Sequence, residues 1–368
     1  MYLSSLLIRN FRLIQDASLE FGPGLHLALG LNAQGKTSLI EAVVFLSTST
    51  SHRTRKEEEL IRWGDDTAFL RGVVDQNGQQ ETLSCGVEKK RKVVKVDDQP
   101  LPRISDLYGR LRTVLFAPED LIIVAGSPQE RRRFIDMAIA QIDSEYIPLL
   151  QQYRRLVKQR NHVLRRMQLD KRNDLTKELD VWNHPFLDAA AQVAERRGEF
   201  IDQIAPLLER FYAGLADDGP CRIEYPAAAP GDAEAIREDL AKRLERTRAK
   251  EIDRGSTQLG PHRDDAPITL DGKSLAQFGS QGQRRAASLA LRLAEADNAR
   301  NAVGAPPVLL IDDVVYEMDN TRRKRFWDNI DFSGQLIVTA TDKDHLGATL
   351  NPTQTFEVSH GAIRSYSS

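Results

Sequence analysis

Apolar residues recur along the chain with two different periods, and their order predicts an α/β protein interrupted by a helical segment. Short apolar runs bounded by turn residues are typical of strands. They are found at residues 3–9, 17–21, 24–29, 67–75, 81–89, 93–96, 114–116, 221–225, 267–270, 308–311, 335–339, 355–358 and 362–365. Helical periodicity is predicted over residues 37–46, most of 127–250, 282–301 and 319–330.

The helical segment in the middle of the chain has a coiled-coil-like pattern. The sequence Ser127-Pro128-Gln129-Glu130 is a capping box with proline in the first turn, and it predicts a helix to about Ile142. A seam with alternating four- and three-residue spacing follows, with one charged interruption at Arg160; it consists of Leu149, Tyr153, Leu156, Arg160, Val163 and Met167. A turn at 171–174 leads into a second helical stretch over 175–215, which Pro185 is expected to break or kink. Together they predict a short antiparallel helical arm.

Composition narrows the class of protein. The 368 residues are 41% hydrophobic and 28% charged, as in an ordinary soluble protein. Cys85 and Cys221 are too few and too far apart for a disulfide framework or a zinc site, which favours a reducing, cytoplasmic setting. We find neither a signal peptide nor an apolar run long enough to span a membrane. The net charge of −2 means that a nucleic-acid partner would need a local basic surface.

A glycine-bounded loop joins the apolar run 24–29 to the helix that starts near residue 37. Its sequence is Gly30-Leu31-Asn32-Ala33-Gln34-Gly35-Lys36-Thr37, which is the P-loop pattern in the strand–loop–helix context that it requires. The loop's N–H groups and the helix N-terminus would hold a polyphosphate, and Lys36 would reach the β- and γ-phosphates. The hydroxyl of Thr37 would bind Mg²⁺. The sequence therefore predicts an ATP site.

A second piece of this site is predicted where the apolar run 308–311 ends in Asp312 and Asp313. In P-loop proteins the first acid at such a strand end holds Mg²⁺, and we assign this role to Asp312. The second acid can orient or deprotonate the attacking water, and we assign this role to Asp313.

A third piece precedes the helix at 282–301. The segment Ser280-Gln281-Gly282-Gln283 offers a hydroxyl, a glycine and a helix N-terminus, which can bind an anion or simply cap the helix. Following a P-loop and ahead of an acidic strand, it resembles the signature segment of ABC-type ATPases. The resemblance implies that Ser280, Gly282 and Gln283 cover the γ-phosphate held by the P-loop of a second copy, in an ATP-dependent homodimer.

The spacing narrows the choice of ABC-type family. Ser280 lies about 250 residues after Gly30, more than a transporter domain allows, and the inserted arm is far shorter than an SMC coiled coil. An SMC-like head with a short arm resembles the RecF family of DNA repair proteins. Matching segments run along the whole chain and comprise Asn10-Phe11-Arg12, residues 116–121, 126–128, 131–136, Gly260-Pro261-His262-Arg263-Asp264-Asp265 and 310–314.

This resemblance implies a fold and a function. We expect an α/β fold, with a P-loop ABC-type ATPase head of mixed sheet and flanking helices at residues 1–120 and 251–368 and an inserted helical arm domain at 121–250. The family resemblance implies ATP-dependent binding of gapped or single-strand/double-strand DNA, action with RecO and RecR to help RecA load, and support of the SOS response. The segment Ala340-Thr341-Asp342 lacks the switch histidine of transporter ATPases, so a weak, DNA-stimulated ATPase is expected.

Two basic clusters are candidate DNA contacts, and each can also be read as a solvated surface. The first, Lys89-Lys90-Arg91-Lys92, is expected at a hairpin tip, and the second includes Arg154, Arg155 and Lys158 on the arm. Two other functions stay open on the residues alone. A transport ATPase would need neither the arm nor residues 260–265, and a metabolic P-loop kinase would have no use for Ser280–Gln283.

Overall fold

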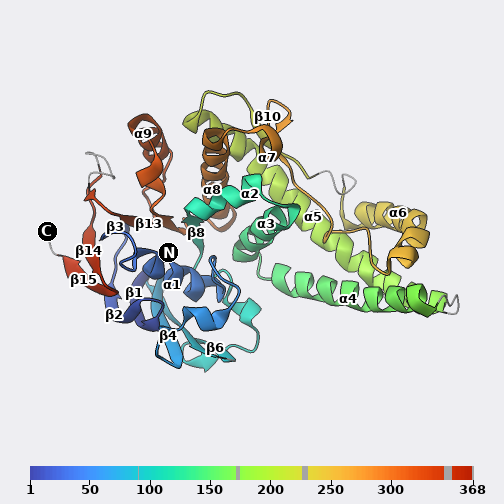
Figure 1. The fold of residues 1–368 in the computed structure, drawn as a ribbon, viewed down its shortest axis with the longest axis horizontal. Coiled ribbons are helices and arrows are strands. Elements are labelled where there is room, and N and C mark those ends of the chain that lie inside the picture. The colour runs from blue at the N-terminus through green and yellow to red at the C-terminus, as the bar shows by residue number, and fades with distance from the viewer. Residues whose placement is uncertain (90, 171–174, 226–230, 344–349, 367–368) are drawn as a thin grey trace. The chain divides into compact units, whose positions relative to one another are not determined.

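The computed structural model describes residues 1–368 except 90, 171–174, 226–230, 344–349 and 367–368 (Figure 1). By contacts the chain divides into two compact units. Unit 1 comprises Met1–Leu121, Arg210–Asp217 and Arg285–Ser368, and unit 2 comprises Ile122–Glu209 and Asp218–Arg284. The two units are not identical to the predicted ATPase head at 1–120 and 251–368 and arm at 121–250, since residues 251–284 lie in unit 2. The division into head and arm stays a prediction. Among the described residues, none of the helices combines the length and the apolar character needed to cross a membrane.

Unit 1 contains two six-stranded sheets, and the first is antiparallel with strand order β2-β1-β4-β5-β6-β7. Its strands are β1 (Tyr2–Phe11), β2 (Ile14–Glu20), β4 (Thr67–Gln76), β5 (Gln79–Glu88), β6 (Arg91–Val96) and β7 (Gln99–Pro100). Alternation of buried and exposed side chains along β1 and β4 reflects one face that packs on the core.

The second sheet of unit 1 carries the nucleotide-loop strand, in the order β15-β14-β3-β13-β12-β8. Its strands are β3 (Gly24–Leu29), β8 (Thr113–Phe116), β12 (Val308–Asp312), β13 (Gln335–Ala340), β14 (Gln354–Ser359) and β15 (Ala362–Tyr366). The five strands from β14 to β8 pair in parallel, so their carboxyl ends share one edge. The continuous apolar runs of β8, β12 and β13 are buried throughout, as expected for strands covered on both faces.

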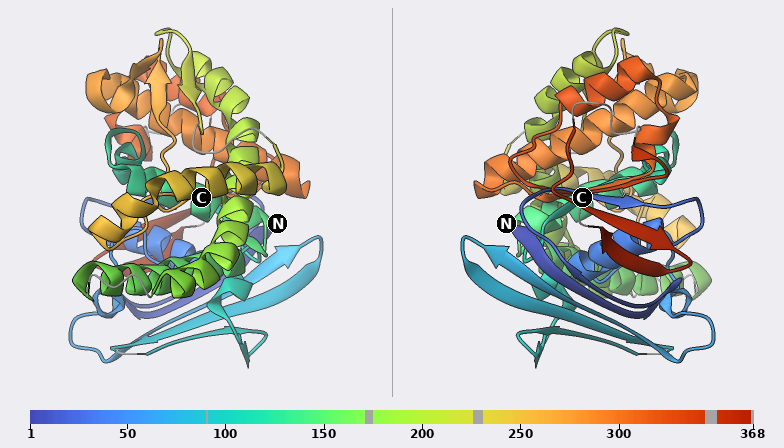
Figure 2. Two further views of the ribbon diagram at one scale, coloured as in Figure 1. Left: turned by 90° about the vertical axis from the view of Figure 1, so that its right-hand side faces the viewer. Right: turned by 90° about the vertical axis from the view of Figure 1, so that its left-hand side faces the viewer.

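Helix α1 (Lys36–Thr48) lies between the two sheets and contacts strands of both (Figures 1 and 2). Nearly all of its side chains are buried, because each face of the helix meets a sheet. One hydrophobic cluster includes residues of α1 and of both sheets, for example Leu6, Phe45 and Ile337. The helix that follows the P-loop is therefore fixed by the core of unit 1.

Unit 1 contains further helical segments besides α1. They are α9 (Asn320–Asp328), the last turn of α5, most of α8 (Gln281–Val303) and short 3₁₀ turns η1 (Glu57–Leu60), η2 (Ile104–Leu107), η3 (Pro118–Asp120) and η5 (Val314–Glu317). The predicted helix 319–330 is thus preceded by a separate turn, and Asp319 caps α9 by accepting a hydrogen bond from the backbone N–H of Arg322.

Unit 2 is mainly helical. Its elements are α2 (Leu121–Ala125), α3 (Pro128–Ile142), α4 (Tyr146–Asp170), most of α5 (Thr176–Leu215), α6 (Ala233–Arg254), α7 (Leu275–Phe278) and a small antiparallel sheet of β9 (Cys221–Ile223), β10 (Ile268–Leu270) and β11 (Lys273–Ser274). Pro185 does not break the helix, because α5 continues through both Pro185 and Pro206, and a kink there stays a prediction. Pro185 has no N–H to donate to the carbonyl of Val181, a residue that is exposed.

The predicted seam on α4 packs against two helices. Val163 and Met167 of α4 join Leu179 of α5 in a buried cluster, against which Ile252 of α6 also packs. Arg160, the charged interruption of the seam, is fully buried and lies 2.6 Å from Glu251 of α6. Its guanidinium also donates to the side chains of Asn183 and Thr257. The predicted turn at 171–174 lies outside the described residues.

Candidate nucleotide-binding site

The P-loop connects β3 to α1 at the carboxyl edge of the second sheet. Its two fixed glycines are required by geometry. Gly35 has φ of 114°, and a Cβ on Gly30 would lie 2.2 Å from the carbonyl oxygen of Val358. The N–H of Gly30 donates to the carbonyl of Ala340 at the end of β13, with 3.2 Å between the atoms. The backbone of the loop is thus tied to its neighbouring strand.

The other side of the loop is held by the turn between β14 and β15. The side-chain oxygen of Gln34 accepts a hydrogen bond from the N–H of His360 at 2.6 Å. The backbone carbonyl of Gln34 accepts a second hydrogen bond, from the N–H of Gly361, at 2.9 Å. Leu31, Asn32 and Ala33 are exposed. A loop anchored at both sides with an exposed centre is preorganised to receive a ligand.

Lys36 is 3% exposed, and its ammonium group points back into the loop. It donates to the carbonyl of Gly30 at 2.8 Å and to that of Leu31 at 3.2 Å. Its Nζ also lies 3.5 Å from Oδ2 of Asp313. The structure therefore brings together the loop cation and the second strand-end acid, although they are far apart in the sequence.

Thr339 connects the two strand-end acids, and sequence reasoning did not identify it. Its hydroxyl donates to Oδ1 of Asp312 at 2.8 Å and accepts the N–H of Asp313 at 2.9 Å. Asp313 has φ of 49°, a left-handed conformation that Asp tolerates better than most residues. The other carboxylate oxygen of Asp313, Oδ1, is buried without a hydrogen-bond partner among the described residues. The sequence signal for Thr339 is only its position near the end of an apolar run, and its place between the loop strand and the acidic strand comes from the sheet order.

The electrostatics at Asp312 fit a cation site. Burial raises the pKa of Asp312 to about 6, against hydrogen bonds from Thr339 and Thr37, while the nearby charges of Asp313 and Glu119 raise it further. A hydroxyl and one carboxylate are a sufficient protein contribution for Mg²⁺, which usually keeps waters and substrate phosphates as its other ligands. No group of three or more His, Cys, Asp or Glu side chains forms a metal-binding cluster within the described residues.

A buried carboxylate on α1, Glu41, also escaped sequence reasoning. It is fully buried and accepts a bidentate pair of hydrogen bonds from Arg12 at 2.7 and 2.8 Å. The hydroxyl of Ser51 donates to it at 2.5 Å, and Arg53 lies 3.8 Å away. An acid inside an otherwise apolar helix could have signalled this cluster, since buried carboxylates need partners. The cluster ties the turn after β1 and the loop after α1 to the helix that follows the P-loop.

The signature-like segment lies in unit 2, where it begins α8. The backbone N–H of Gln283 donates to Oγ of Ser280 at 3.2 Å, and the N–H of Ser280 donates to the side chain of Gln283 at 2.9 Å. This reciprocal pair is a capping box. Ser280 is exposed and Gly282 is partly exposed, so both remain accessible to a ligand or to a second molecule.

The predicted DNA contacts differ in accessibility. Lys92 is largely withdrawn from solvent, because it pairs with Glu57 and donates to the carbonyl of Ser49. The more exposed members of the two clusters are Lys89, Arg91, Arg154, Arg155 and Lys158. Lys90 lies outside the described residues.

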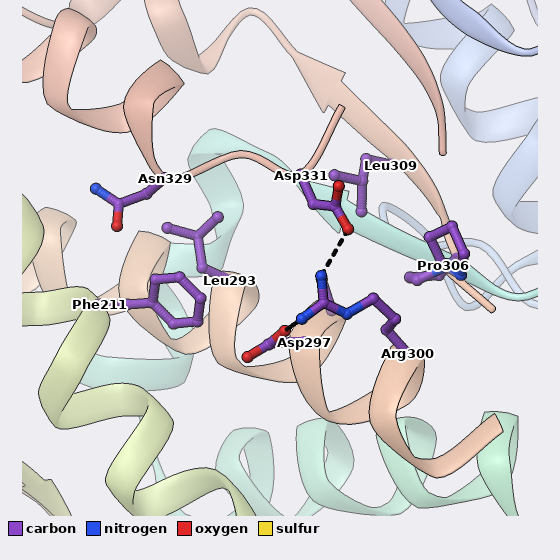
Figure 3. Close-up of a pocket in the computed structure, with 10 residues that line it drawn as sticks. Phe211, Leu293, Asp297, Arg300, Pro306, Leu309, Asn329 and Asp331 are labelled. Atoms are coloured by element: carbon purple, nitrogen blue, oxygen red, sulfur yellow. Dashed lines mark hydrogen bonds and ion pairs between the residues drawn. The ribbon is translucent and has the colours of Figure 1, made fainter. Parts of the chain in front are cut away.

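A small pocket of unit 1 is unrelated to this site (Figure 3). Phe211 and Leu293 line it together with Pro306, which precedes β12. Arg300 at its rim pairs with Asp297 and with Asp331, which precedes β13. It therefore lies at the amino ends of the parallel strands, whereas the P-loop lies at their carboxyl ends.

The chain is similar to one family of known proteins along nearly its whole length. The family model described as RecF/RecN/SMC N terminal domain matches residues 2–364. The DNA replication and repair protein RecF of Listeria monocytogenes is 37% identical over 99% of this chain and 100% of that protein. The RecF protein of Bacillus pumilus is 36% identical over 99% of this chain and 100% of its own.

Solved structures give the same result. A structure of the recombination mediator protein RecF-ATP in the RecFOR pathway has a TM-score of 0.90 and 30% identity, and covers 100% of this chain and 98% of that chain. An SMC head bound to a domain of ScpA has a TM-score of 0.58 at 14% identity, with 100% and 98% covered, and shows a likeness of fold alone. This chain belongs to the RecF family, and its fold is that of an SMC-like ABC-type ATPase head.

Proposed function

We propose that this protein is an ATP-dependent DNA-binding protein of replication and recombinational repair. The observation that carries the proposal is the arrangement at the carboxyl edge of the second sheet. There, Lys36 of the P-loop meets Asp313, while Asp312 and Asp313 share the hydroxyl of Thr339. The full-length similarity to proteins named DNA replication and repair protein RecF supports the role in repair. It favours this role over the alternative of a transport ATPase.

The residues fit ATP with Mg²⁺. The amides of residues 30–37 would surround the phosphates, and Lys36 would exchange its carbonyl partners for phosphate oxygens. Thr37 and Asp312 would hold Mg²⁺, which supplies charge neutralisation at the phosphates when bound. The unpartnered buried Oδ1 of Asp313 supports a role in orienting the attacking water. The similarity of this chain to a RecF-ATP structure supports the nucleotide.

The signature-like segment would act across a homodimer. Ser280, Gly282 and Gln283 of one copy would complete the site around the phosphates held by the other copy's P-loop. ATP would then hold the dimer together, and a weak hydrolysis, stimulated by DNA, would release it. Exposure of Ser280 at the start of α8 supports this use, since its hydroxyl can donate to an anion while its oxygen accepts the N–H of Gln283.

The cellular context follows the family. The protein would act in the cytoplasm with RecO and RecR on gapped or single-strand/double-strand DNA, and would help RecA load and support the SOS response. The similarity to a recombination mediator of the RecFOR pathway supports these partners. Two buried thiols, Cys85 and Cys221, are compatible with a reducing compartment.

A single experiment tests the proposal. Gapped, single-stranded and duplex DNA probes are titrated with the full-length protein, with and without ATP and Mg²⁺, and size-exclusion chromatography is run under the same conditions. We expect ATP to raise DNA affinity and to shift the protein from monomer to dimer. A protein whose DNA affinity and oligomeric state are both unchanged by ATP would contradict the proposal. A metabolic kinase would bind ATP without either response.

A further inference from the structure

Trp63 is the most exposed of the large hydrophobic side chains that the structure describes. Its side chain is 97% exposed, although burial of an indole normally stabilises a protein. Its backbone is held firmly on both sides. Ile61 forms a β-bridge with Phe11, the N–H of Arg62 donates to the carbonyl of Asn10 at 2.9 Å, and the N–H of Asp65 donates to the carbonyl of Arg62 at 3.0 Å. A rigid backbone that presents a free indole is a feature of a binding surface.

Strand register places Trp63 at the same end of the first sheet as the basic hairpin tip. Strand β4 begins at Thr67, which pairs with Glu88 at the end of β5, and Glu88 pairs with Arg91 at the start of β6. The end of β5 and the start of β6 therefore lie at the same end of the sheet as the loop that carries Trp63. Lys89 connects them directly, since its Nζ lies 2.9 Å from Oδ1 of Asp66, three residues after Trp63.

The loop after α1 brings further cations to this end of the sheet. Arg12, in the turn after β1, donates to the carbonyl of Glu59 at 2.6 Å, and the hydroxyl of Thr54 donates to the side chain of Glu59. Arg55 lies in this loop and is exposed, as is Arg91 of the hairpin. Neither has an ion-pair partner within the described ranges of the chain.

The acids at this end are largely neutralised. Asp65 pairs with Arg62 at 3.3 Å, and Asp66 pairs with Lys89. Glu59 lies 3.7 Å from Lys56. Glu58 and Glu88 are exposed acids of the same segments, but residues 53–66 and 88–92 together hold eight Lys and Arg against six Asp and Glu, so their formal charge is positive. Arg55 and Arg91 are the exposed cations of these segments that we single out.

These features favour a nucleic-acid partner over a protein partner. A protein hot spot lies at the centre of a desolvated apolar patch, whereas the neighbours of Trp63 in the chain are Arg62, Gly64, Asp65 and Asp66. A single aromatic ring among cations is the arrangement on which an unpaired base stacks while its phosphates meet the cations. We propose that Trp63 is a stacking platform for an unpaired base of single-stranded DNA, with Arg55 and Arg91 contacting the flanking phosphates.

This inference rests on the proposed function and deepens it, because it names a surface for the single-stranded part of a gapped substrate. A duplex keeps its bases stacked on one another and offers Trp63 none. The surface should therefore discriminate between the two forms of DNA. Basic residues alone would not do so, since both forms carry phosphates.

The test compares Trp63→Ala and Trp63→Phe in the full-length protein with ATP and Mg²⁺. The probes are an oligo(dT) strand, the same strand with abasic positions, and a duplex of equal length. We expect Trp63→Ala to weaken oligo(dT) binding by roughly 5- to 100-fold, Trp63→Phe to retain most of the affinity, and both to bind the duplex like the parent. The slope of log affinity against log salt on oligo(dT) should equal that of the parent for Trp63→Ala. For Arg91→Gln this slope should become shallower by about 0.7, because one phosphate contact is lost.

A matched control is Leu13→Ala, because Leu13 is also exposed, at 52%, in the turn after β1 but has no ring. Its oligo(dT) affinity should equal that of the parent. Equal binding of oligo(dT) by the parent and Trp63→Ala would overturn the inference and leave the proposed function standing if ATP still raises DNA affinity. Weaker binding of Trp63→Ala to purified RecR, with DNA binding unchanged, would instead identify a protein contact and overturn it. A parent that binds no DNA with ATP would overturn both.

Discussion

The ammonium group of Lys36 lies 3.5 Å from the carboxylate of Asp313, so the P-loop cation and a strand-end acid form an ion pair. Lys36 is otherwise satisfied only by the carbonyls of Gly30 and Leu31 among the residues that the structure describes. Since a triphosphate offers more negative charge than one carboxylate, we expect the ammonium group to turn to the phosphates when ATP binds. Asp313 is then left to face the water that attacks them.

Replacement of Lys36 by alanine should greatly reduce ATP affinity, by roughly tenfold or more, because hydrogen bonds to charged groups contribute about 1.5–3 kcal/mol each. Isothermal titration calorimetry with ATP and Mg²⁺ measures the effect, and circular dichroism checks the fold. Lys56→Ala is the matched control, since Lys56 is an exposed lysine that pairs with Glu59 away from the P-loop. Unchanged ATP affinity in a folded Lys36→Ala protein would refute the assignment.

Replacement of Asp313 by asparagine should preserve ATP binding, because Thr37 and Asp312 are retained, but abolish most of the hydrolysis. Dimers formed with ATP should therefore persist longer. Phosphate release and size-exclusion chromatography measure the two effects. Asp328→Asn, a change on the exposed side of α9, serves as the control. Hydrolysis at the parent rate would show that Asp313 is not the carboxylate that acts on water.

The Arg160–Glu251 pair should be essential to the stability of unit 2. Both side chains are fully buried, 2.6 Å apart, and the guanidinium also stacks on the ring of Phe186. Arg160→Met should lower the free energy of unfolding by about 3–5 kcal/mol, because it leaves Glu251 buried without a counter-charge. The double variant Arg160→Met, Glu251→Met should recover much of the loss. Urea denaturation measures these values, and a double variant no more stable than the single one would contradict the explanation.

Acid should destabilise the protein through His262. Burial lowers the pKa of His262 to about 4, and its ring contacts the hydroxyl of Tyr153 at 2.6 Å. Since the unfolded chain binds the proton near pH 6.5 and the folded chain only near pH 4, stability is complete above pH 6.5 and falls as the pH drops through this window. The loss approaches about 3 kcal/mol near pH 4 as an upper limit.

Urea denaturation of the parent and His262→Gln between pH 7.5 and 4.5 isolates this contribution. The difference in unfolding free energy between the two proteins should shrink as the pH falls, because glutamine does not titrate. A difference that is constant across the range would mean that His262 does not control the acid sensitivity.

ATP should steepen the salt dependence of duplex binding. A dimer presents two copies of each basic cluster, and each neutralised phosphate contributes about −0.9 to the slope of log affinity against log salt. The exposed arm residues Arg155 and Lys158 allow a test, in which the double change to glutamate should weaken binding and make the slope shallower. Equal slopes with and without ATP, or parental binding by the double variant, would place the DNA surface elsewhere.

The sequence alone determined the parts of the fold that depend on local pattern. Most strands of both six-stranded sheets, the glycine loop and the long helices of unit 2 follow from hydrophobic periodicity and turn residues, because each is specified within a few adjacent positions. The short elements β7, α2 and α7 were not predicted. Gly30 and Gly35 were identifiable for the same reason, since a P-loop is a contiguous motif. The P-loop context then assigned roles to Asp312 and Asp313, and the resemblance to ABC-type ATPases added Ser280.

The tertiary structure decided which distant groups meet. Thr339 contacts Asp312 because β13 lies between the loop strand and the acidic strand, and strand order is not encoded in the pattern of any one strand. In the sequence, Arg160 is a charged residue in an otherwise apolar seam, and only the fold shows that it pairs with Glu251 of α6. In the sequence, Lys92 belongs to a basic cluster expected on the surface, and only the fold shows that it binds Glu57 and the carbonyl of Ser49. These pairings depend on contacts across many residues of sequence, so only the packed chain determines the partner of each charge.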